Sequence, residues 1–181
     1  PQTDDDAVKA TYNQQRRAAL KKHEESTKQA EMLSMVLNTI GGGLGLVLFG
    51  AIATRLGRKG AFVLYHAGAF VLVILLFQVL IANNASALLL AITLPVFGFF
   101  TLGMHAGYAV YFPELYPTRV RGTGVGFCFN MGRLAAAGVL FAVGAVAVGD
   151  EKKAMLLAPL YLVGVVIVLF ARETRGQELP E

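Results

Sequence analysis

Long apolar stretches separated by short polar clusters make up the chain after its first 31 residues. Five stretches are delimited by flanking charges, and they cover residues 32–53, 61–82, 87–111, 122–148 and 154–171. Each is close to the roughly 20 residues that a helix, rising about 1.5 Å per residue, needs to cross the hydrocarbon of a bilayer. Because lipid offers no partner to free backbone groups, each stretch is predicted to be a continuous helix.

Residues 1–31 follow a different pattern, polar throughout, with six basic and six acidic side chains and no Gly or Pro after Pro1. Thr3 and the three aspartates that follow it suit a helix start. Val8, Tyr12 and Ala19 form an apolar stripe that is too thin for a coiled coil or a membrane-surface helix. We therefore predict a solvated helical segment outside the bilayer.

Composition strengthens this reading, because apolar residues make up 55% of the 181 and charged residues only 15%. A soluble globular balance is excluded, and an all-α polytopic membrane protein is predicted. The net charge of +4 lies in scattered loops and does not form a nucleic-acid patch. The single cysteine, Cys128, provides neither a disulfide framework nor a metal set, and no metal or cofactor is expected. The start at Pro1, without an initiator Met, suggests a piece of a longer protein.

The loops on one side of the five spans carry far more basic residues than those on the other side. The richer set consists of Arg55, Arg58, Lys59, Arg119, Arg121, Arg172 and Arg175. The opposite short loops hold only Lys152 and Lys153, offset by Asp150 and Glu151. The positive-inside rule places the richer set and residues 172–181 in the cytoplasm, and residues 1–31 outside. The six basic residues of that outer segment run against this assignment.

Glycines within the spans have the spacing of closely packed helices, as in the pairs Gly41/Gly45 and Gly103/Gly107. A phosphate-binding loop is excluded because no strand precedes them. A compact polar knot, PELYPTRVRG at residues 113–122, joins the third and fourth spans. Pro113 and Pro117 are expected to stop helices there.

This knot resembles the junction of the tenth and eleventh helices in the major facilitator superfamily of solute transporters, in the branches that carry sugars and organic ions. Residues 50–59, GAIATRLGRK, are similar to the superfamily's loop signature, with Thr54 where an acidic residue is usual, and Gly57 permits a tight turn there. Residues 173–176, ETRG, resemble the acidic motif after the last helix, with Arg172 in place of Pro. The resemblance implies helices eight to twelve of a twelve-helix fold. It also implies an ionic latch that involves Arg55, Arg58, Glu114, Arg121 and Glu173. A surface ion pair without a gating role is the alternative.

Arg133 is the one permanently charged residue in the spans. It lies twelve positions after Arg121, about 18 Å along a helix and so near the bilayer midplane. Burying this charge is costly, so we expect it to face a wet cavity with an anionic partner. The resemblance points the same way, since members that carry organic anions place an arginine there. A structural arginine, paired with backbone carbonyls or with an acid elsewhere in the protein, is the alternative.

Other polar groups in the spans are weaker candidates for contact with a solute. His105 lies one turn from Tyr108 and could titrate or bind substrate, or be a lone hydrogen-bonded histidine. Tyr108, Asn38 and Asn130 complete the candidate set, although amides often join helices. His66 is expected to do no chemistry.

The function that these features predict is part of a secondary active transporter. Its solute would be an organic anion (a carboxylate), moved by proton- or ion-coupled alternating access in a bacterial cytoplasmic membrane. A sugar transporter of the same superfamily and a non-transporting scaffold or receptor are the alternatives. An intramembrane enzyme is disfavoured, because the spans contain no acids and only separated histidines. The expected partners are lipid, the solute and the missing N-terminal half of the same transporter.

Overall fold

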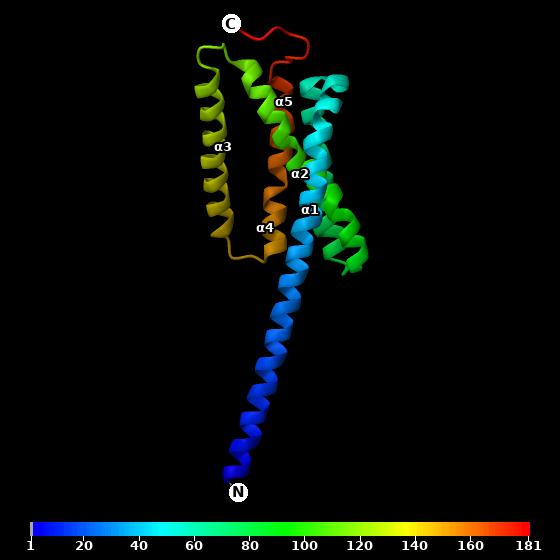
Figure 1. Cartoon of the computed structure of the whole chain (residues 1–181), viewed down its shortest axis with the longest axis vertical. Helices are drawn as coiled ribbons and strands as arrows, with labels where there is room; N and C mark the ends of the chain where they lie inside the picture. The colour runs from blue at the N-terminus through cyan, green and yellow to red at the C-terminus, as the bar shows by residue number, and fades with distance from the viewer. Residues whose placement is uncertain (1) are drawn as a thin grey trace. The chain divides into compact units, whose positions relative to one another are not determined.

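The computed structural model describes the backbone of residues 2–181 and the side chains of residues 12–149 and 152–181. Every regular element in this part of the chain is helical (Figure 1). In order, the elements are α1 (Gln2–Ile74), η1 (Leu75–Ile81), α2 (Ala87–Leu115), α3 (Arg121–Gly144), α4 (Asp150–Leu157) and α5 (Pro159–Phe170). The segments long and apolar enough to cross a membrane are Tyr12–Ile81, Ala87–Leu115, Arg121–Gly144 and Lys152–Phe170. The predicted all-α polytopic class is confirmed.

The chain divides into two compact units, Pro1–Val36 and Leu37–Glu181. In the first unit the described side chains are almost all exposed and bond locally, as in the Lys28–Glu24 ion pair at 2.7 Å. Helix α1 begins at Gln2, while the side chains of Thr3 and Val8, on which a helix start and an apolar stripe were predicted, lie outside the described residues.

Gly57 interrupts α1 and reverses the chain. Its φ of 79° and ψ of 168° lie in a region that is open essentially only to glycine. The Tyr65 hydroxyl donates to the Gly45 carbonyl at 2.8 Å, across the turn. The rings of Phe49 and Phe62 also meet there, with centroids 5.3 Å apart. The two halves of α1 in the second unit therefore form an antiparallel hairpin, and the tight turn expected from Gly57 occurs.

The core lies where this hairpin packs against α2. Its buried members are Phe49, Ala53, Ala61, Phe62, Tyr65, Ala69, Met104 and Tyr111. The helices approach so closely that a Cβ on Gly41 would lie 1.7 Å from the Pro95 carbonyl oxygen, and one on Gly45 would lie 2.2 Å from that of Phe99. The glycines therefore act as the expected contact surface between helix backbones.

Two expectations about helix ends are wrong. Pro113 does not stop a helix but lies inside α2, which continues to Leu115. The proline removes one N–H from the ladder, and its own carbonyl, which lies in the last turn and is therefore free, accepts from Arg121 Nε at 3.0 Å. The last predicted span, 154–171, is divided into α4 and α5 at Ala158, because Pro159 has no N–H to continue the ladder and suits the first turn of a new helix.

Candidate functional site

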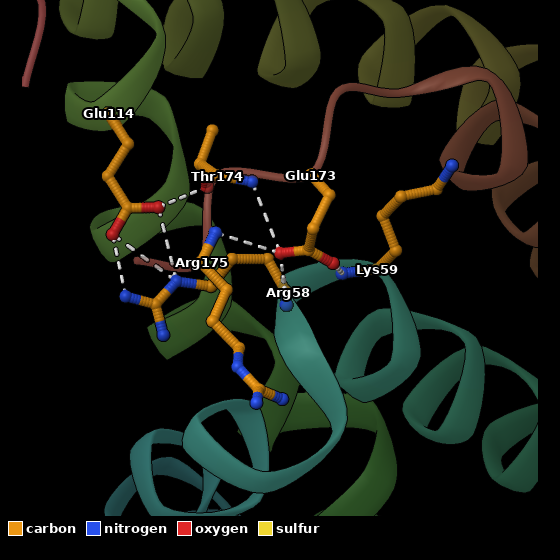
Figure 2. Close-up of polar contacts among 6 residues, drawn as sticks. All are labelled: Arg58, Lys59, Glu114, Glu173, Thr174 and Arg175. Atoms are coloured by element: carbon orange, nitrogen blue, oxygen red, sulfur yellow. Dashed lines mark hydrogen bonds and ion pairs between the residues drawn. The ribbon is translucent and has the colours of Figure 1, made fainter. Parts of the chain in front are cut away.

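Polar side chains from three distant parts of the chain meet beside the Gly57 turn (Figure 2). Arg58 and Lys59 follow the turn, Glu114 lies in the last turn of α2, and three residues follow α5. We call this set the loop cluster, and its members are Arg58, Lys59, Glu114, Glu173, Thr174 and Arg175.

Arg58 and Glu114 form the central ion pair of the loop cluster. Arg58 Nη2 lies 2.7 Å from Glu114 Oε1, and Arg58 Nε lies 3.1 Å from Oε2, so the carboxylate is gripped at both oxygens. Only 18% of the Arg58 side chain and 16% of the Glu114 side chain are exposed to solvent. The hydrogen bond to Glu114 raises the pKa of Arg58 further, against the opposing effect of burial. The hydroxyl of Thr174 donates to the same carboxylate at 2.5 Å. A carboxylate at a helix C-terminus is unfavourable alone, and Arg58 offsets this.

Glu173 caps the helix that restarts after Gly57. Its Oε1 accepts the backbone N–H of Arg58 at 2.8 Å and its Oε2 accepts that of Lys59 at 3.0 Å. These are groups that a helix N-terminus leaves unsatisfied, here capped by a residue more than a hundred positions away. The backbone N–H groups of Thr174 and Arg175 also donate to Glu173. Partial desolvation raises the pKa of Glu173, but the four N–H donors outweigh it and lower the pKa overall.

The segment after α5 fastens other helix ends in the same region. Arg175 Nη1 donates to the Arg55 carbonyl at 2.8 Å, just before the Gly57 break. Lys59 Nζ donates to the Leu169 carbonyl in the last turn of α5 at 2.7 Å. Cations at helix C-termini complement both the free carbonyls and the helix dipole. The loop cluster is therefore a set of mutual helix caps built around one ion pair.

The structure brings together three of the five residues predicted for the latch, namely Arg58, Glu114 and Glu173. Arg55 contributes its carbonyl. Arg121 lies apart, where its guanidinium donates to the carbonyls of Pro113, Tyr116 and Pro180. Sequence reasoning missed Thr174 and the capping roles of Lys59 and Arg175. The ETRG motif was a signal for two of these, but only its acid was selected.

A second site surrounds Arg133, in a cavity of about 510 Å³ between α2 and α3. We call it the Arg133 pocket, and it is lined by His105, Tyr108, Phe112, Cys128, Phe129, Gly132, Arg133 and Ala136. The guanidinium of Arg133 is exposed and has no hydrogen bond or ion pair with any described residue. Its position within an apolar helix leaves an uncompensated charge that an anion would complement.

Aromatic rings form much of the wall opposite Arg133. Tyr108 and Phe112 are stacked with centroids 5.4 Å apart, and Phe112 meets Phe129 edge-on at the same distance. His105 Nδ1 lies 3.1 Å from the Leu102 carbonyl, which can only accept, so Nδ1 carries the proton. The pocket thus combines one cation, one imidazole and a flat apolar surface.

Of the predicted solute-binding residues, the structure brings together Arg133, His105 and Tyr108, and it separates the two amides from them. Asn130 is exposed, and its Nδ2 donates to the Gly126 carbonyl at 2.8 Å along its own helix. Asn38 lies at the crossing with α2 beside Gly98. Its Oδ1 is buried without a partner among the described residues.

Comparison with known proteins gives a consistent picture. The family model described as "Sugar (and other) transporter" matches residues 29–181. A Haemophilus influenzae protein described as a metabolite transport protein is 32% identical over 138 residues, covering 75% of this chain and 33% of the relative. No solved structure gives a significant match.

Two further relatives have more specific names. A cis,cis-muconate transport protein of Acinetobacter baylyi is 32% identical over 133 residues, covering 72% of this chain and 31% of the relative. Organic cation/carnitine transporter 7 of Arabidopsis thaliana is 33% identical over 155 residues, covering 76% of this chain and 27% of the relative. The chain thus spans between about a quarter and a third of the length of the curated relatives it matches.

Proposed function

From the premise that this chain belongs to the sugar (and other) transporter family of the major facilitator superfamily, we propose that it forms part of a secondary transporter for small organic anions. The rest of the protein would supply the facing half of the solute path. Transport would proceed by rocking of two helical halves around a site near the bilayer midplane, coupled to a proton or another ion.

The observation that carries the anion proposal is the unpaired guanidinium of Arg133 in an aromatic-walled pocket within the membrane-spanning part of the chain. A guanidinium can grip a carboxylate at two points. The name of the Acinetobacter relative supports this choice loosely, because muconate is a dicarboxylate, whereas the Arabidopsis relative is named for organic cations as well as for carnitine, which carries a carboxylate. A sugar has no charge for Arg133 to neutralise, so the sugar alternative has less support.

The test is uptake of cis,cis-muconate, hereafter the dicarboxylate probe, by the intact protein in proteoliposomes. Arg133→Lys keeps the charge but loses the planar fork, and we expect affinity to fall about tenfold to a hundredfold, which corresponds to the ~1.5–3 kcal/mol of a hydrogen bond to a charged group. Arg133→Ala should reduce affinity further. Uptake of neutral sugars that neither substitution changes would contradict the anion proposal.

The loop cluster would act as the latch of this transporter. Its ion pair links the Gly57 hairpin to the end of α2, and its caps link both to the segment after α5. Partly exposed ion pairs contribute little net stability, so a set of them can form in one conformation and separate in the other. If the loop cluster is instead a surface contact without a gating role, breaking it should leave turnover unchanged.

In this proposal the loop cluster faces the cytoplasm, and the protein lies in a bacterial cytoplasmic membrane, as the bacterial relatives suggest. Single cysteines in a Cys128→Ser background would test the orientation in intact cells with a membrane-impermeant thiol reagent. Cysteines at Asn83 and Lys152 should react, and one at Arg58 should not. Labelling at position 58 from outside would reverse the assignment.

A further inference from the structure

His66, for which the sequence suggested no chemistry, lies buried between the helices beside a second cavity. Only 5% of the residue is exposed. The cavity has a volume of about 480 Å³ and is lined by His66 together with residues of α2, α3, α4 and α5. A Cβ on Gly164 would lie 2.2 Å from His66 Cδ2, so this glycine of α5 provides the space that the imidazole ring occupies.

The hydrogen bonds of His66 fix the tautomer of its neutral form. Nδ1 lies 2.8 Å from the Phe62 carbonyl oxygen, which can only accept, so Nδ1 carries the hydrogen. Nε2 is then an acceptor, and it lies 3.4 Å from the hydroxyl of Tyr108. In the neutral state the Tyr108 hydroxyl can donate to His66 Nε2, and its other acceptor nearby is Met104 Sδ at 3.9 Å; Tyr108 also forms part of the wall of the Arg133 pocket.

We propose that His66 is the proton-binding group of the transporter, and that it acts on the Arg133 pocket through Tyr108. This proposal rests on the proposed anion transport. A proton taken from water would bind Nε2, which would then donate to the Tyr108 oxygen and no longer accept from it. The phenol keeps its own hydrogen and turns it toward the Arg133 pocket, where it can donate to a bound carboxylate. The only covalent changes are the O–H bond broken in the hydronium ion that gives the proton and the N–H bond formed on His66.

The surroundings of His66 couple this proton to the anion. The titratable groups that face it are Tyr108 from α2 and Tyr161 from α5, while the described residues of α3 and α4 around the cavity are alanine, valine and leucine. No carboxylate of the described chain neutralises a protonated His66 there. Beyond Tyr108, the pocket adds His105 and the cation of Arg133. A charged imidazole is therefore unfavourable beside an empty pocket and favourable beside an occupied one, and by linkage the proton must then strengthen anion binding.

The experiment measures the affinity of the intact protein for the dicarboxylate probe between pH 6 and 8.5, where the probe remains ionised. Protonated His66 favours the anion, so the wild-type Kd should rise with pH, by a factor of about 5 to 100 over the range. His66→Gln should flatten this dependence. Tyr108→Phe keeps the ring but removes the hydroxyl, and it should reduce the dependence even if His66→Gln fails to fold. Tyr161→Phe removes the other hydroxyl at the cavity and should leave the dependence intact.

The outcomes separate this inference from the proposed function. A wild-type protein that binds the probe through Arg133 with no pH dependence would overturn the role of His66 alone. The same holds if His66→Gln and Tyr108→Phe both retain the wild-type dependence, or if His105→Gln removes it while His66→Gln does not. A wild-type protein that fails to bind the probe at any pH would overturn the anion proposal itself, and the role of His66 with it.

Discussion

In the loop cluster the Arg58 guanidinium meets a carboxylate of the same chain, whereas the Arg133 guanidinium meets none among the described residues. Both arginines lie next to apolar helices, and both face side chains from α2. In the loop cluster the charged side chains pair with one another and cap the helix ends of the same chain. The other leaves a charge open, which is how a site for a charged ligand differs from a structural contact.

The largest effect within the loop cluster should come from its turn. Gly57→Ala would force a non-glycine residue to φ 79°, at about 1–3 kcal/mol, and would place a Cβ 2.7 Å from Glu173 Oε2. Thermal unfolding of the purified protein should show a clear loss of stability. Gly50→Ala is the matched control, since a Cβ there would meet nothing beyond its own helical turn within 4 Å and the backbone is helical. Equal stability of the two variants would show that the turn tolerates the strain.

The ion pair should affect transport more than folding. Glu114→Gln removes the charge that Arg58 and Thr174 share but keeps the shape of the side chain. If the loop cluster is a latch, turnover should change several-fold while the Kd for the dicarboxylate probe remains close to wild type, and the loss of stability should stay within the ~1–3 kcal/mol expected for a pair between exposed and buried. Glu178→Gln, an exposed acid outside the cluster, is the control. Unchanged turnover in both variants would leave Glu114 as a structural contact.

The sequence predicted the fold better than the site because hydropathy is local and side-chain pairing is not. Apolar runs located the membrane helices, and the glycine at position 57 indicated the turn. The same local reasoning placed the helix stop at Pro113, because a missing N–H is visible in a sequence, whereas the contacts that hold the last turn of α2 in helical form, such as the bond from Arg121 to the Pro113 carbonyl, are not. The break at Ala158 was missed although Pro159 is visible in the sequence, because the span was delimited by the length of the apolar run and not by the proline inside it.

The family resemblance grouped Arg58, Glu114 and Glu173, but the geometry of contacts between distant residues could not be predicted from the sequence. Glu173 caps a helix that begins at Arg58, and nothing local to either residue indicates this. His66 gains its place from the missing side chain of Gly164, almost a hundred residues away. Arg133, in contrast, could be selected from the sequence, because a single charge within an apolar run has a large desolvation cost wherever its neighbours lie.

A smaller effect should distinguish the Glu173 cap from the other caps of the loop cluster by the pH dependence of the stability it contributes. The pKa of Glu173 is lowered from its usual value of 4.5, so its contribution to stability is complete above that value and is lost as the pH falls through the lower folded-state value. Glu173→Gln should therefore melt below the wild type at pH 7, and the difference should shrink as the pH is lowered below about 4. A difference that is the same at both pH values would mean that the ionised carboxylate is not what caps the helix.

The smallest expected effect is the change in stability caused by replacing Arg133, and it tests the comparison between the two arginines. Arg133→Gln removes a guanidinium without a partner in the described chain, so the melting temperature should change little, by the equivalent of about 0.5 kcal/mol or less. Arg58→Gln is the matched variant at the other site, and it leaves the Glu114 carboxylate, 16% exposed, without its cation. The loss of unfolding free energy in Arg58→Gln should lie between that for breaking an exposed ion pair and that for breaking a buried one, about 1–3 kcal/mol. Because both variants replace the same side chain by the same amide, their difference reports only the surroundings of the two arginines. A large loss for Arg133→Gln would show that this arginine is already satisfied in the intact protein, and the pocket would then be a structural contact between its two halves.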